Sequence, residues 1–289
     1  MTAQAKLPLK RTNKSDIQPR RMDFAFDETI DRYWFDNSQF KSILLTGLSC
    51  SFPEGERFFV RSLRHFQKQI RNPKLLEEVK GFIGQEAHHG NEHDAFNALM
   101  QRKGLPTKKV SDFVLNGLKL QGKWLSAERQ LAKTCALEHF TAMLAELILE
   151  EPDFLKGMDE RMLPLWLWHA VEESEHKSVA FDVYQDQVGK YWLRSSEMLI
   201  TSAEFLFFTT LHYFQLRRED DRPTNWQDIR KGFNWLLGKP GYLRRLGPVW
   251  ASYLKRDFHP SQRDSSALRE AGMRKLAKMM GEQLVYPQG

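Results

Sequence analysis

Two short motifs place a glutamate three residues before a histidine. GQEAHHGNEH contains Glu86 and His89, and HAVEESEH contains Glu173 and His176. Residues three apart on a helix lie on one face, so each carboxylate can meet its imidazole at one metal ion. Such pairs also arise by chance in a chain with many glutamates and histidines, so the motifs need support from their placement.

Two single glutamates supply that support. Glu56 precedes the first motif and Glu138 precedes the second. Dinuclear sites in helix bundles take one glutamate from each of two helices and an ExxH pair from each of the other two. Glu56 and Glu86 are equidistant from a predicted turn, and so are Glu138 and Glu173. In antiparallel hairpins each pair therefore lies level, about 22 Å from its turn, which predicts one shared site.

The donors indicate which metal the site takes. Four carboxylates and two imidazoles suit two divalent cations, and we expect iron, with manganese or zinc as alternatives. Residues 1–21 and 217–289 are basic, whereas 22–216 carry a net negative charge that bound cations would neutralise. The alternative, exposed Glu/His pairs on a polar face, fits poorly because apolar residues such as Phe82 and Trp168 are interleaved with the motifs.

Further polar residues near the motifs have open roles. His169 shares a face with Glu173 and His176 in the pattern HxxxExxH, and it is expected to be a seventh ligand or to hold one in place. His93 follows His89 by four residues and Glu86 by seven, so it shares their face of the helix. Whether it is a ligand or supports one stays open. Glu172 is a candidate ligand in place of Glu173. Three further residues could support the site, with packing or surface exposure as the alternative: Cys135, Asp182 and Tyr184. We expect His88, His139 and Glu175 to point elsewhere.

Four predicted helices position these residues. Apolar periodicity and capping residues place them at about 53–71, 73–101, 126–151 and 164–188. Turns separate the first two and the last two, and roughly twenty residues with weak helical signal connect the two pairs. Two hairpins joined by a long crossover predict an all-α fold, namely a ferritin-like four-helix bundle with additional C-terminal helices.

The stretch 198–216 is the one candidate for membrane contact. It is long enough to span a bilayer, but Glu204 and His212 interrupt it, and charged groups at mid-bilayer are costly. We expect a core helix packed on the bundle. Peripheral contact of this stretch with a membrane is the alternative, because arginines flank it.

Composition sets the class of protein. The chain has 289 residues, of which 41% are hydrophobic and 28% charged, and this excludes collagen-like and wholly disordered chains. Two cysteines and the lack of a secretory signal favour a cytoplasmic protein. The net charge of +6 lies at the two ends, so nucleic acid is not an expected partner. We expect a flexible basic segment at 1–25, the metal-binding bundle at 26–220 and a basic helical extension at 221–289.

Four strings of the sequence carry a resemblance to a known family. FPEGERFF, FIGQEAHHGNEH, LEHFTA and LWHAVEESEHKSVAFDVY resemble the bacterial family labelled predicted metal-dependent hydrolases, over residues 30–260. The resemblance implies metal binding first and hydrolysis second. The ligand order, with the added histidine of HxxxExxH, is also similar at motif level to that of the di-iron N-oxygenases of arylamines. This similarity implies ligand roles for Glu56, Glu86, His89, Glu138, His169, Glu173 and His176.

Three functions fit these observations. The favoured one is an enzyme in which a di-iron centre activates dioxygen to oxidise a small, apolar or aromatic substrate. The first alternative is a hydrolase that uses a metal-bound water, and the second is a non-catalytic metal-binding protein. The high aromatic content suits an apolar substrate, although core packing explains it equally well. A homodimer is compatible with the sequence, which identifies neither the substrate nor the bound metal.

Overall fold

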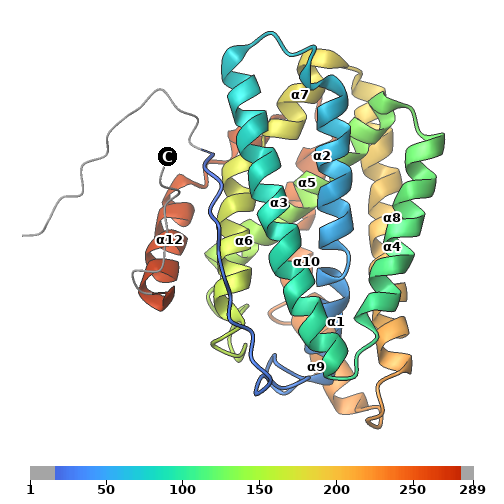
Figure 1. The fold of residues 1–289 in the computed structure, drawn as a ribbon, viewed down its shortest axis with the longest axis vertical. Coiled ribbons are helices and arrows are strands. Elements are labelled where there is room, and N and C mark those ends of the chain that lie inside the picture. The colour runs from blue at the N-terminus through green and yellow to red at the C-terminus, as the bar shows by residue number, and fades with distance from the viewer. Residues whose placement is uncertain (1–16, 281–289) are drawn as a thin grey trace, which may run out of the picture.

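The computed structural model describes residues 17–280, and within that range every regular element is a helix. The long helices run side by side along the longest axis of the molecule (Figure 1). Apart from helices and turns, the described residues contain an isolated bridge between Phe35 and Met158. The all-α prediction is therefore confirmed, and the ferritin-like assignment stays a prediction.

The first hairpin consists of α2 (Phe52–Gln67) and α3 (Pro73–Arg102). Asn72 caps α3, because its side-chain oxygen accepts hydrogen bonds from the backbone N–H groups of Lys74 and Leu75 at 3.0 and 3.4 Å. The cap satisfies donors that the first turn of a helix leaves free. The predicted turn between these two helices is confirmed.

The second hairpin contains α5 (Ala127–Glu150), followed by α6 (Leu163–His176) and α7 (Val179–Gln187). The single helix predicted at 164–188 is wrong, because it is interrupted directly after His176. The apolar pattern continues across the interruption, so periodicity alone does not reveal it.

The crossover between the hairpins is itself helical, which corrects the prediction of a weak helical signal. It contains α4 (Thr107–Trp124), which buries little and exposes Phe113, Leu120 and Trp124. Its apolar side chains do not gather on a buried face, and two glycines lower its helix propensity. These features hid the helix from the sequence pattern.

Two further helices extend the bundle. The sequence analysis did not identify α1 (Gln39–Ser49), which packs against α8 (Tyr191–Arg218). The core helix predicted at 198–216 lies within α8, which packs on α5 with one face and leaves the other exposed. None of the helices among residues 17–280 has the length and apolar character needed to cross a membrane.

The C-terminal region adds shorter helices, as predicted: α9 (Trp226–Leu237), α10 (Tyr242–Arg245), α11 (Gly247–Ser252), a 3-10 turn (Pro260–Gln262) and α12 (Ser266–Met280). The last of these packs closely on α5 and α6. A Cβ atom at Gly272 would lie 2.7 Å from Leu149 Cδ2 and 2.8 Å from Val171 Cγ2, so a larger residue here would force these side chains to move.

The N-terminal segment 17–25 lies along α3 rather than free of the bundle (Figure 1). Ile17 and Phe24 are buried, and glycines of α3 accommodate the segment. A Cβ atom at Gly84 would lie 2.4 Å from Pro19 Cγ. Flexibility was predicted for 1–25; residues 17–25 are packed, and 1–16 lie outside the described residues.

The hydrophobic core consists of two clusters stacked along the bundle. One includes Phe96 and Trp168, and the other includes Phe58, Phe82 and Val179. Both motifs lie between these clusters along their helices. The fold therefore places the polar motif residues in the middle of the bundle, enclosed at both ends by apolar side chains.

Candidate metal centre

The structure gathers all seven predicted ligands into two adjoining groups of buried side chains. Within each group one donor atom per residue lies within 4.8 Å of the others. The first group contains Glu56, His89 and His169, and the second contains Glu86, Glu138, Glu173 and His176. The donors come from α2, α3, α5 and α6, so each of the four predicted helices contributes.

Glu173 connects the two groups. Its Oε1 atom lies 3.1 Å from His169 Nε2 and 3.4 Å from His89 Nδ1, in the first group. Its Oε2 atom lies 3.3 Å from His176 Nε2, in the second. A carboxylate with one oxygen toward each group is arranged to bridge two cations.

One expectation about the first motif is wrong. The sequence analysis placed Glu86 and His89 at one metal ion, but Glu86 Oε1 lies 3.2 Å from His176 Nε2, in the second group. Three residues advance about 4.5 Å along a helix, which is close to the separation of about 3.5–4 Å between ions in dinuclear sites. An ExxH pair can therefore contribute to both positions.

The centre contains buried polar atoms that no protein group satisfies. Both carboxylate oxygens of Glu56, Glu86 and Glu138, and Nε2 of His176, have no hydrogen-bond partner among the described residues. Buried polar atoms are almost always paired, because an unpaired one costs about 1–3 kcal/mol. Cations placed between the two groups would satisfy these atoms, so the residues present fit a metal centre.

The electrostatics of the metal-free chain agree with this interpretation. Burial raises the pKa of Glu56 to about 8, with the charge of Glu173 adding to the effect. Burial, followed by the charge of Glu173, holds the pKa values of Glu86 and Glu138 well above their usual range. Burial also acts on Glu173, but its contacts with neighbouring imidazoles outweigh it and lower the pKa of that carboxyl well below its usual range. Divalent cations would stabilise all four carboxylates in the ionised form.

A hydrogen-bond chain orients His169. Asn97 Oδ1 accepts from the Ser49 hydroxyl at 2.9 Å, so Ser49 Oγ accepts in turn from His93 Nδ1 at 2.8 Å. His93 Nε2 then accepts from His169 Nδ1 at 2.7 Å. The chain leaves the lone pair of His169 Nε2 directed at Glu173. His93 is thus in neither donor group and contacts a donor instead, which favours the supporting role over the ligand role.

A second chain orients His176. The amide nitrogen of Gln85 donates to Glu175 Oε2 at 2.8 Å, so the amide oxygen is free to accept from His176 Nδ1 at 3.1 Å. The lone pair of His176 Nε2 is therefore directed into the second group. Glu175 also forms an ion pair with Arg20 at 2.6 Å, as expected for a residue that points away from the centre.

Glu172 contacts His89 and lies in neither donor group, whereas Glu173 belongs to one. The Oε2 atom of Glu172 lies 3.2 Å from His89 Nε2, and its Oε1 atom accepts a hydrogen bond from Arg20 Nη1 at 3.0 Å. His89 presents its other nitrogen, Nδ1, to Glu173. Contact with the two carboxylates outweighs burial and raises the pKa of His89 to about 10 in the metal-free chain.

Three predicted candidates lie outside the centre. Cys135 Sγ contacts the backbone oxygen of Ala180 at 3.2 Å within the apolar core, which is the alternative that the sequence analysis favoured. Asp182 contacts His259 Nε2 at 2.7 Å, and the Tyr184 hydroxyl donates to a backbone oxygen. The polar groups of these three residues are engaged elsewhere, and none of the three belongs to either donor group. Neither His88 nor His139 belongs to a donor group, as expected.

Four supporting residues were not identified from the sequence: Ser49, Gln85, Asn97 and Arg20. Asn97 carried a signal, because it lies four residues after His93 on the same face of α3. The other three reach the centre through contacts between segments that are distant in sequence or through a side-chain conformation, and no spacing rule indicates them.

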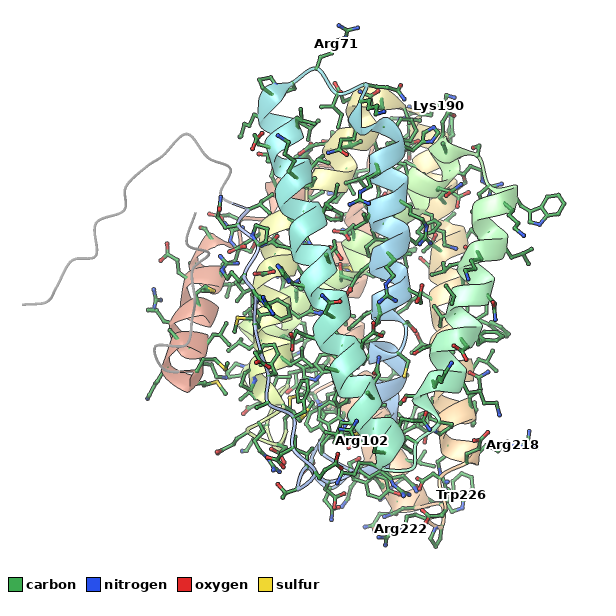
Figure 2. All side chains as sticks on the ribbon, in the orientation of Figure 1. Arg71, Arg102, Lys190, Arg218, Arg222 and Trp226 are labelled. Carbon is green, nitrogen blue, oxygen red and sulfur yellow. The ribbon has the colours of Figure 1, made fainter. Side chains whose placement is uncertain are left out.

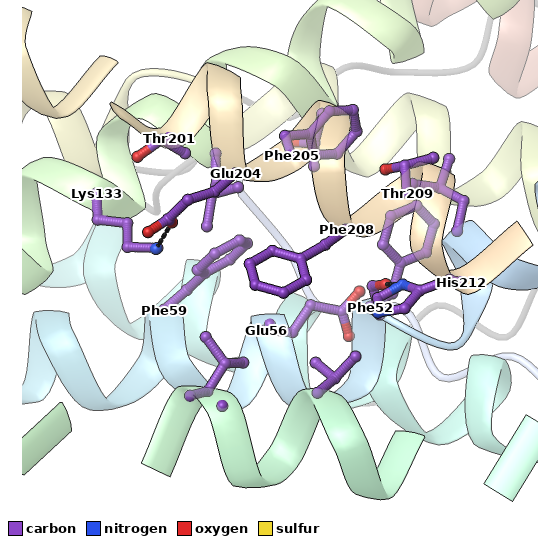
Figure 3. A pocket seen from close by; sticks show the side chains of 18 of the residues that line it. Phe52, Glu56, Phe59, Lys133, Thr201, Glu204, Phe205, Phe208, Thr209 and His212 are labelled. Carbon is purple, nitrogen blue, oxygen red and sulfur yellow. Dashed lines mark hydrogen bonds and ion pairs between the residues drawn. The ribbon is translucent and has the colours of Figure 1, made fainter. Parts of the chain in front are cut away.

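A cavity of about 200 Å³ leads to the centre from one side. Its walls come from α2, α4, α5 and α8 and are mainly apolar, with Phe52, Phe59, Phe205 and Phe208 among the lining side chains (Figure 3). Glu56 and Glu173 are the members of the centre that line it. The structure thus connects the centre to an aromatic chamber.

A basic groove reaches the same centre from another side. It lies between α2 and α3, has a volume of about 370 Å³, and is lined by Glu56 and Glu86. Three arginines of α2 line it as well, namely Arg57, Arg61 and Arg64. This approach suits polar or anionic molecules, in contrast to the apolar cavity.

The fold and the centre define a class of protein: an all-α bundle with a buried set of carboxylates and imidazoles suited to metal. The chain belongs to the family described as predicted metal-dependent hydrolase, whose model matches residues 18–264. Comparisons with curated proteins and with solved structures give no significant match. The family resemblance of the sequence is confirmed, and the similarity to arylamine N-oxygenases stays a prediction.

Proposed function

We propose that this protein is a dinuclear metal enzyme that holds two iron ions and uses dioxygen to oxidise a small apolar substrate. The apolar cavity that ends at Glu56 and Glu173 carries the proposal. A dry cavity of about 150 Å³ holds benzene. The volume of about 200 Å³ here accommodates one aromatic ring or a short alkyl chain.

The residues of the centre have distinct tasks in this proposal. Two ferrous ions bound here would supply the electrons that reduce dioxygen. Three of the donors would hold one ion and three would hold the other, and Glu173 has one carboxylate oxygen toward each group. The predominance of carboxylate oxygens favours iron or manganese. The phenylalanines of the cavity exclude water and keep a substrate beside Glu56.

Metal analysis of protein purified in air, combined with its near-ultraviolet spectrum and dioxygen uptake, tests the proposal. We expect iron near two ions per chain, a ferric absorption band, and dioxygen consumption after reduction. Stoichiometric zinc without that band would refute the oxidation chemistry. Bound metal with neither dioxygen uptake nor ester hydrolysis would indicate the non-catalytic alternative.

Two glycines of α4 offer a matched test of the cavity. Gly117 lines the cavity and Gly122 does not, and a Cβ atom at either position meets no atom within 4 Å. Both Gly→Leu substitutions favour the helix, by up to about 1 kcal/mol. We expect Gly117→Leu to abolish binding of an aromatic probe such as aniline and Gly122→Leu to leave it unchanged. Equal binding by the two variants would exclude the cavity as the substrate site.

Hydrolysis is a second candidate, because the basic groove reaches Glu86 and because the family description names it. A bound cation lowers the pKa of a water molecule, and the arginines of the groove would hold an anionic ester beside it. In this case Arg61→Ala with Arg64→Ala should reduce hydrolysis of an anionic ester at least tenfold. Gly117→Leu should leave it unchanged, so the two variants separate the two functions.

A further inference from the structure

The outer face of α8 carries no charge over most of its length. Every exposed residue from Trp192 to Phe214 is uncharged, a distance of about 33 Å along the helix. Leu206 and Phe207, at the middle, are 71% and 62% exposed. Basic residues occur at the two ends, where Figure 2 shows Lys190 and Arg218 at opposite ends of the helix. The exposed residues are Trp192, Ser196, Leu199, Ile200, Ala203, Leu206, Phe207, Thr210 and Phe214.

The ionisable residues within this stretch point inward. Glu204 forms an ion pair with Lys133 of α5, and both line the cavity (Figure 3). His212 is buried and its Nδ1 lies 3.1 Å from the Ser51 hydroxyl. The inner face of α8 therefore carries the ionisable groups among apolar side chains, and over this stretch its outer face carries none. An ordinary surface helix has its charged residues on the outer face.

The neighbouring helix α4 widens this surface. Lys109 of α4 forms an ion pair with Glu219, which directly follows α8, so the start of α4 lies by the end of α8. The rings of Phe113 and Phe208 are 6.0 Å apart. Three large side chains of α4 are exposed on this surface or next to it: Phe113, Leu120 and Trp124. We call the outer faces of α4 and α8 together the α4–α8 face.

Charge distinguishes the partners that this face could take. Within α4 four lysines accompany one acidic residue, Asp112. Lys119 and Lys123 are exposed and have no ion-pair partner among residues 17–280. Apolar helices bordered by lysines and tryptophans lie in the interface of anionic membranes, where each basic side chain contributes about 1 kcal/mol. A second copy of the chain would instead bring two basic borders together.

The α4–α8 face measures about 33 Å along α8 and about 27 Å along α4, and each helix is about 10 Å across, which gives roughly 600 Å². A protein partner could also cover an area of this size, so the charge of the border decides the partner. We propose that the α4–α8 face docks on the surface of an anionic lipid membrane.

The docked orientation places the cavity toward the lipid. Phe113 and Gly117 line the cavity and are also exposed on α4, so the rim of the cavity belongs to the α4–α8 face. An apolar molecule dissolved in the membrane then reaches Glu56 without crossing water. This delivery step rests on the proposed function, whereas docking itself requires neither metal nor turnover.

Sedimentation of the full-length protein with vesicles tests the docking. The vesicles contain phosphatidylcholine with phosphatidylglycerol, or phosphatidylcholine alone. We expect the protein to bind the first kind, and Leu206→Glu with Phe207→Glu to weaken binding at least tenfold. Lys119→Glu with Lys123→Glu should have a similar effect, because it reverses the charge of the border. All four positions are exposed and Leu206 and Phe207 lie outside the cavity lining, so the variants should fold.

A matched control adds two carboxylates elsewhere. Ala95 and Ala98 are exposed on α3, and Ala95→Glu with Ala98→Glu should bind the vesicles as the unaltered protein does. The proposal is overturned if the unaltered protein ignores anionic vesicles or if this control loses binding equally. It is also overturned if the protein is a dimer that Leu206→Glu with Phe207→Glu converts to a monomer. Intact docking together with absent enzyme activity would refute the proposed function alone.

Discussion

Substitution of Glu56 by glutamine should stabilise the metal-free protein and destabilise the metal-loaded protein. In the metal-free chain, burial raises the pKa of Glu56 from 4.5 to about 8. A group whose pKa is higher in the folded state favours folding fully below the unfolded pKa, and this contribution is lost as the pH rises through the folded pKa. Near neutral pH, the raised pKa of Glu56 therefore lowers the free energy of unfolding of the metal-free protein.

The structure sets the size of this effect. At pH 7 the solution is about 2.5 pH units above the unfolded pKa, and each unit corresponds to about 1.4 kcal/mol, so ionisation of Glu56 costs about 3–4 kcal/mol. Glutamine is neutral and avoids this cost. Because 1 kcal/mol shifts the Tm of a chain of this size by about 2–4 °C, the metal-free variant should melt roughly 6–16 °C above the metal-free unaltered protein. The difference should vanish near pH 4.5.

Thermal melts of chelated and metal-reloaded protein, each with measured metal content, provide the assay. Reloading should reverse the order, since the variant lacks a charged ligand and binds less metal. Glu54→Gln is the matched control, because Glu54 lies two residues away on α2 and pairs with Arg57 at 2.6 Å outside the centre. It should show no reversal. If Glu56→Gln is less stable than the unaltered protein in both forms at pH 7, Glu56 is a structural residue and the reasoning fails.

Three further outcomes check the centre. His89→Ala should lose most bound metal while His88→Ala keeps it, as measured by elemental analysis, and equal losses would contradict the register of α3. Ser49→Ala removes the acceptor for His93 and should weaken metal binding about 10–100-fold in a competition titration, whereas the equally buried Ser62→Ala should affect only stability. Chelation of the unaltered protein at neutral pH should lower its Tm, because metal binds the folded state preferentially, and an unchanged melt would argue against a buried centre.

The positions of the seven donors could be predicted because two simple rules determine them. Helical periodicity decides which residues share a face, and the antiparallel hairpin decides which residues lie level. Glu56 with Glu86, and Glu138 with Glu173, satisfied both rules. The same rules do not decide which donor faces which ion, so the split of Glu86 from His89 required coordinates.

The residues that support the donors could not be predicted. Ser49 lies on a helix that the pattern did not reveal, and Arg20 lies in a segment whose composition indicated flexibility. Each reaches the centre through contacts between segments distant in sequence, which depend on packing rather than on period. The helix α4 was missed for a related reason, since much of its apolar surface faces outward and gives no amphipathic signal relative to the core.

The stretch 198–216 shows how much depends on the direction of its side chains. Glu204 and His212 argued against a helix that spans a membrane, because charged groups at mid-bilayer are costly. In the structure both side chains line the cavity, and Glu204 is paired there with Lys133. The residues that make the stretch polar therefore belong to the interior, and the surface they leave on the outer side of α8 is entirely uncharged from Trp192 to Phe214. The direction of each side chain is what places one face of this helix in the wall of the cavity and leaves the other face available for the membrane docking that we propose.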